Sequence, residues 1–180
     1  MDMAAGSIDQ FLQEAYARLR VDYPKFYKMD NLSKAGFLGA EVLFSGRKIA
    51  EDVGAENVAL VFSNAHASLD TDVRYAASAK TVASPALFVY TLSNIVAGEV
   101  CIRHGLKGEN AFFISSQFDE VLTASYAELV PARVVIAGWI DVMSDRHDVF
   151  LYLLDKNAAS GIPHSPAVLK EIYTNALWNN

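Results

Sequence analysis

Apolar residues recur at helical spacing near the amino-terminal end of the chain. From Ile8 to Leu19 they fall every three or four positions, and Ser7 stands where an N-cap is expected. After a proline-containing turn, a second stretch from Ser33 to Phe44 again has one apolar face. The pattern therefore predicts two amphipathic helices in the first quarter of the sequence.

A different pattern begins after Gly54. The run from Asn57 to Phe62 is short and almost uniformly apolar, which is typical of a buried central strand. Further on, Pro85 opens a long apolar segment that reaches His104, and Gly105 follows its end. Proline in the first turn and glycine just past the last are the expected helix boundaries. We therefore predict a long, largely buried central helix.

Strand and helix patterns then alternate along the chain. The predicted elements are a strand (Ala111 to Ser115), a helix (Phe118 to Leu129), a strand (Arg133 to Ile140), a further strand (Val149 to Leu154) and a final helix (Ala167 to Trp178). Such alternation produces a mostly parallel sheet with helices packed on it. The strand after the charged turn is expected to run antiparallel to its neighbour. The sequence therefore predicts the α/β fold class.

Composition narrows the functional classes. The chain has 180 residues, 52% of them hydrophobic, and a net charge of -6, which fits one globular domain. No cluster of Lys and Arg offers a nucleic-acid surface. No segment is long and apolar enough to span a membrane, and no export signal is recognised. With Cys101 as its single cysteine, we expect a cytoplasmic protein without disulfide bonds.

The loop that follows the first predicted strand is the first place to look for chemistry. Residues 63–72, SNAHASLDTD, leave the carboxyl end of a strand, where α/β proteins bind ligands. A Ser-His-Asp triad is not expected because triads draw on distant segments, and a metal site is not expected because the spacing fits no known signature. Cys101 is expected to pack inside its helix, and His104 to lie as a cation at the helix end. No general base stands out.

The segment from Asn57 to Val142 resembles the amino-terminal region of β-ketoacyl synthases of the thiolase-like superfamily. The resemblance rests on SPALFVYTL, SNIVAGEVCIRHGLKGEN, the strand AFFIS and the later VVIAGWIDV. The upstream YPKFYKMDNLSKAGFLGAE is similar to a diverged branch associated with bacterial aryl polyene and flexirubin pigments, which includes chain-length-factor-like proteins. The resemblance to β-ketoacyl synthases implies a three-layer α/β/α half-thiolase with a mostly parallel, five-stranded mixed sheet.

The resemblance also implies a domain layout. Residues 1–180 form a single synthase-like domain with its core at about 57–156, a helical extension at 1–50 and a tail at 157–180. No metal or other cofactor is expected.

The same resemblance assigns site residues. In the family, a nucleophilic cysteine opens the helix after the strand AFFIS, and counting from Asn110 places Gln117 there. In an alternative register Ser115 or Ser116 takes that position. The substrate-binding residues would be Asn94, Phe118 and Trp139, the last standing at the second glycine of the family's Gly-Gly pair. The family's catalytic histidines belong to a carboxyl-terminal half outside these residues, so unaided condensation is not expected.

Three functions remain open. The first is a catalytically inactive synthase-like subunit that forms a homodimer, or a heterodimer with an active ketosynthase. The second is a weak acyltransferase, thioester hydrolase or decarboxylase that uses Gln117 or the neighbouring serines. The third is a binding module for acyl carrier protein or an acyl chain, with the helix from Pro85 to His104 as one wall.

Overall fold

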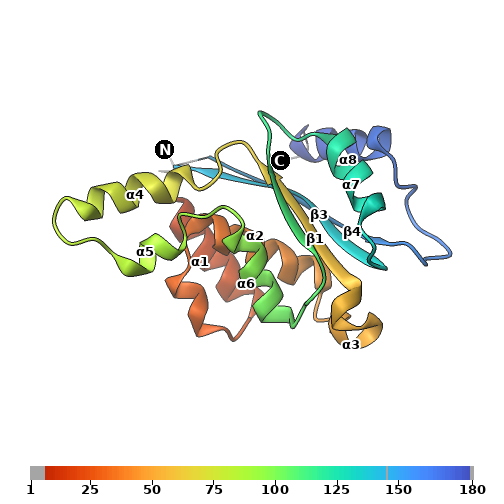
Figure 1. Cartoon of the computed structure of the whole chain (residues 1–180), viewed down its shortest axis with the longest axis horizontal. Helices are drawn as coiled ribbons and strands as arrows, with labels where there is room; N and C mark the ends of the chain where they lie inside the picture. Colours follow the sequence, from red (N-terminus) through yellow and green to blue (C-terminus); the bar gives the residue numbers. More distant parts are fainter. Residues whose placement is uncertain (1–6, 145, 179–180) are drawn as a thin grey trace, which may run out of the picture.

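The apolar run after Asn57 is the centre of the molecule. In the computed structural model, which describes residues 7–144 and 146–178, it forms strand β1 (Val58–Asn64), and every residue of the strand is buried. The order of strands in the sheet is β2-β1-β3-β4. The other three strands are β2 (Asn110–Ile114), β3 (Val134–Met143) and β4 (Arg146–Asp155). Helices cover both faces of this sheet, which gives three layers (Figure 1).

The pairing of the strands confirms the mostly parallel sheet. Strand β1 pairs in parallel with β2 and with β3, and β3 pairs antiparallel with β4. The eight α-helices of the described residues are α1 (Ile8–Leu19), α2 (Asn31–Phe44), α3 (Ile49–Val53), α4 (Leu69–Ala79), α5 (Pro85–Val89), α6 (Ile95–His104), α7 (Glu120–Leu129) and α8 (Pro166–Trp178). Short 3-10 helices lie at Pro24–Lys28 and Ala55–Asn57. None of the described helices is long and apolar enough to cross a membrane.

Alternation along the central strands divides the core in two. Leu60 and Phe62 face the cluster that includes residues of α1, α2 and α6, whereas Ala59 and Val61 face a smaller cluster with residues of α7. Because successive side chains of a strand point to opposite faces, a strand covered on both sides must be apolar throughout. The three-layer α/β/α arrangement follows from this pattern.

The sheet has four strands in the described residues, not the expected five. The segment before β1 folds into helices, and its main helix α2 packs directly into the larger core, with Phe37 and Phe44 almost fully buried. A Cβ at Gly36 would lie 2.2 Å from Val96 Cγ2, so α2 approaches α6 closely. The helical spacing of its apolar residues suits a helix and not a further strand.

The predicted helix from Pro85 to His104 is wrong as a single, buried element. It forms two helices, α5 and α6, separated by residues 90–94, and Phe88 and Leu92 are exposed. Asn94 occupies the N-cap position of α6, and Thr91 and Ser93 also lie in the break. The break therefore lies beside polar residues that favour helix ends over helix interiors. The two outer boundaries were predicted correctly.

Candidate functional site

The carboxyl ends of the three parallel strands lie at one edge of the sheet. Asn64, the last residue of β1, lies opposite Ile114, the last residue of β2. The Ser115 amide donates a hydrogen bond to the Asn64 carbonyl at 3.0 Å. This bond holds the residues that follow β1 and β2 next to each other. Ligands in α/β proteins bind at such an edge, so the loops after β1 and β2 and the end of β3 form the candidate site.

The loop after β2 carries the residues predicted at the nucleophile position. Ser115 is half-buried, and its hydroxyl donates to the Gln117 carbonyl at 2.7 Å, whereas Ser116 and Gln117 are exposed. The loop lines a hollow of about 270 Å³ that extends to Val121. The structure therefore presents Gln117 to solvent next to the hollow.

Helix α7 does not activate Gln117. The N-cap of this helix is Asp119, whose carboxylate accepts the Leu122 amide at 2.8 Å. Gln117 lies two residues before the cap, outside the first turn, where the helix dipole acts. Its amide is not a nucleophile. Among the described residues, neither Ser115 nor Ser116 is hydrogen-bonded to a histidine, lysine or carboxylate that could take its proton.

Phe118 and Trp139 pack together next to this edge, on the face of the sheet that α7 and α8 cover. Both are buried, with their ring centroids 6.4 Å apart, and the Phe118 ring lies 4.8 Å from that of Tyr173 on α8. The large indole therefore fills space next to Gly138 that a second glycine would leave open. Asn94 is the N-cap residue of α6, in the helix layer on the other face of the sheet, and it forms no hydrogen bond to the other candidates within the described structure.

A histidine and an aspartate meet at the same edge. Asp141 near the end of β3 accepts hydrogen bonds from the Ala65 and His66 amides at 3.0 and 3.1 Å, and its other carboxylate oxygen lies 2.8 Å from His66 Nδ1. His66 is 41% exposed. A carboxylate on Nδ1 fixes the orientation of an imidazole and leaves its second ring nitrogen, Nε2, for a contact with substrate or water. This pair is capable of activating a water molecule.

Sequence reasoning did not find Asp141 as the partner of His66. The loop was expected to extend from Ser63 to Asp72, but α4 begins at Leu69, and Asp70 instead accepts the Ser144 amide at 3.0 Å. The described residues contain no group of metal-ligating side chains. One feature of the sequence could have indicated Asp141: it directly follows the predicted parallel strand that ends at Ile140, where functional residues of α/β proteins often lie.

The thiol of Cys101 does not lie at this edge of the sheet. Cys101 lies within α6, and burial raises the pKa of its thiol. A thiol with a raised pKa has little thiolate at neutral pH. Cys101 is therefore not an activated nucleophile, and it lies in a different element from the predicted position, Gln117.

Comparison with solved structures identifies the fold. The chain aligns with one chain of a solved complex, that of the ketosynthase ApeO with its chain length factor ApeC from Xenorhabdus doucetiae, with a TM-score of 0.50 and 16% sequence identity. The alignment covers 68% of this chain and 51% of the other. The chain has a thiolase-like, ketosynthase-type fold. It spans about half the length of that solved chain. No family model and no curated protein matches the sequence.

The ketosynthase-type fold explains why the polar loops gather at one edge. Parallel strands joined by helical connections all end on the same side of the sheet, so residues far apart in sequence meet there. His66 and Asp141 are 75 positions apart, and the loop with Gln117 lies between them in the chain. At the level of sequence identity found here, the likeness describes the fold, and the roles of Gln117, Ser115, Ser116, Asn94, Phe118 and Trp139 stay predictions.

Proposed function

We propose that this chain is a non-condensing, ketosynthase-like subunit that associates with an active ketosynthase of acyl-chain biosynthesis, in the manner of a chain length factor. The observation that carries the proposal is Gln117: the residue predicted at the nucleophile position is an exposed amide before the N-cap of α7. The solved structure to which the fold is similar is itself a complex of a ketosynthase with its chain length factor.

The edge of the sheet supplies a surface for such an association. Strand β2 is outermost, so one side of its backbone is unpaired within the described structure. Its final residue, Ile114, is 54% exposed, and Phe113 is only half-buried. An open strand edge with apolar side chains readily pairs with a strand of another chain. We therefore place the contact with the partner subunit at β2.

An acyl-loading experiment tests the proposal. The wild-type protein, Gln117→Cys and Ser116→Cys are mixed with acyl-charged carrier protein, with and without a co-expressed ketosynthase of the same organism, and their intact masses are measured. We expect no acyl adduct on the wild type. Gln117→Cys should gain one adduct only in the complex, because an exposed thiol before the helix cap has no base of its own. Ser116→Cys is the matched control, since it adds a thiol one residue away.

Two results would contradict this function. An acyl adduct on wild-type Ser115 or Ser116 would show an active nucleophile. Release of free acid from the carrier protein by the wild type alone, abolished by His66→Gln, would instead favour a thioester hydrolase in which His66 and Asp141 activate water. That alternative is the second candidate because the structure brings these two side chains together.

A further inference from the structure

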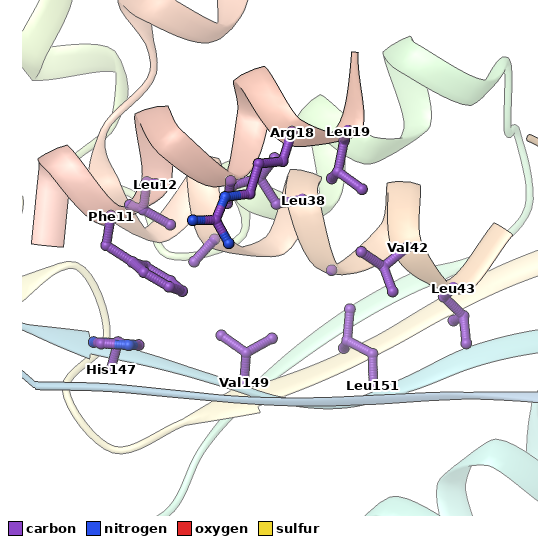
Figure 2. Close-up of a pocket in the computed structure, with 13 residues that line it drawn as sticks. Phe11, Leu12, Arg18, Leu19, Leu38, Val42, Leu43, His147, Val149 and Leu151 are labelled. Atoms are coloured by element: carbon purple, nitrogen blue, oxygen red, sulfur yellow. The ribbon is translucent and has the colours of Figure 1, made fainter. Parts of the chain in front are cut away.

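An apolar groove of about 490 Å³ lies between α1, α2 and β4 (Figure 2). It is on the opposite face of the sheet from Phe118 and Trp139, since Val149 and Leu151 of β4 point toward α1 and α2. All residues that line the groove are apolar or glycine except Arg18 and His147. The groove is therefore separate from the edge that carries Gln117, and binding in it does not depend on the proposed function.

Small residues line the groove where the helices approach β4. Ala15 of α1 and Ala35 and Gly39 of α2 are among the residues that line it. At Gly39 an added Cβ would lie 2.8 Å from Leu151 Cδ1, so the helix comes close to the strand there. Larger side chains stand around the mouth, among them Phe11, 51% exposed, and Val42, 57% exposed. Clustered apolar groups left in water in this way mark binding surfaces.

One positive charge faces this apolar surface. The Arg18 guanidinium points from α1 into the gap between the helix and β4 (Figure 2). Within the described residues it forms no hydrogen bond or ion pair, whereas Arg103 pairs with Glu41 and Arg133 with Asp155. No acidic residue lines the groove. A guanidinium without a partner is complementary to a carboxylate, which it binds through two parallel hydrogen bonds.

We propose that this groove binds a free medium-chain fatty carboxylate, with its alkyl chain against Val42 and Val149 and its carboxylate on Arg18. The volume lies within the range of small-molecule sites, about 300–1,000 Å³. A stable protein partner would need a much wider contact, about 800 Å² on each side. The aliphatic walls bury methylene groups, and the single cation selects one anionic head group.

Titration with decanoate, followed by methyl NMR and calorimetry, tests the site. We expect one molecule to bind per chain, with shifts of the Leu19, Val42 and Val149 methyl signals. Each methylene added between octanoate and decanoate should tighten binding about fourfold. Arg18→Gln should weaken decanoate binding about tenfold and leave decanol binding unchanged, because only the carboxylate uses the guanidinium. Arg20→Gln, which removes a nearby charge outside the groove, should bind decanoate as the wild type does.

A second variant separates a loss of binding from a loss of folding. Val42→Glu alters an exposed helical position, so the fold should be retained, but the new carboxylate should abolish decanoate binding. The proposal is overturned if these methyl signals do not move below the micelle concentration, or if decylamine binds as tightly as decanoate. It is also overturned if the wild type sediments as a dimer that Val42→Glu dissociates, since a second copy would then occupy the groove.

Discussion

Gly138 has a backbone conformation that other residues rarely adopt. It lies within β3 at φ +149°, and a Cβ there would be 1.9 Å from the Phe150 carbonyl oxygen of the neighbouring β4. The contact is with backbone, which cannot move aside as a flexible side chain does. Glycine at this position is therefore required by the antiparallel pairing of β3 with β4, next to the candidate site.

Replacement of this glycine should destabilise the fold. We expect Gly138→Ala to lower the free energy of unfolding by about 2–4 kcal/mol, from backbone strain and close packing together. Urea unfolding measures the change. Gly98→Ala is the matched control, because nothing lies within 4 Å of its added Cβ inside α6; there alanine should stabilise by about 0.5–1 kcal/mol. Equal stability of Gly138→Ala and the wild type would show that β3 and β4 separate easily here.

At the scale of elements, the contact between α2 and α6 combines an ion pair with a partly buried histidine ring. Arg103 Nε donates to Glu41 Oε1 at 2.6 Å. The His104 ring packs edge-on against Phe44 with centroids 4.4 Å apart. Burial lowers the pKa of His104, against an opposing effect of Glu41. Burial therefore disfavours the cation that was expected at the end of α6, and the His104 ring packs within the helix interface.

This interface should weaken in acid. The unfolded chain binds a proton on His104 near the ordinary histidine value of 6.5, whereas the folded chain does so only at lower pH. The stability due to neutral His104 is therefore present above pH 6.5 and is lost as the pH falls through the lowered pKa. His104→Gln should make urea midpoints less dependent on pH in this range. An NMR titration of the His104 ring with a midpoint above 6.5 would disprove the explanation.

At the scale of the whole molecule, two exposed isoleucines allow a test of the proposed partner surface. One lies on that surface and the other lies elsewhere. Ile114 ends the open edge strand β2, whereas Ile162 lies in the segment before α8 and is 73% exposed. We expect Ile114→Lys to weaken association at least about tenfold, since a charge would be placed at the strand edge. Ile162→Lys should leave it unchanged. Sedimentation of the protein alone and with the ketosynthase measures both. If only Ile162→Lys weakens the complex, the partner binds the α7 and α8 layer.

Local patterns determined most of the elements. The period of three to four residues and the Ser7 cap predicted α1 with its observed bounds, and the short apolar run predicted buried β1. These signals depend on neighbours in sequence, since caps and helical faces are formed by residues within about one turn of each other. The mostly parallel sheet with its antiparallel last strand followed from the order of such elements.

Only the tertiary structure decided which distant groups meet. The pairing of His66 with Asp141 depends on the register of β1 against β3, and the break between α5 and α6 leaves apolar residues exposed that the pattern alone would bury. The groove around Arg18 likewise depends on how α1 crosses α2 and β4. The sequence thus determined elements, whose interactions are local, whereas packing between elements decided the sites, because long-range contacts leave no periodic signal in the chain.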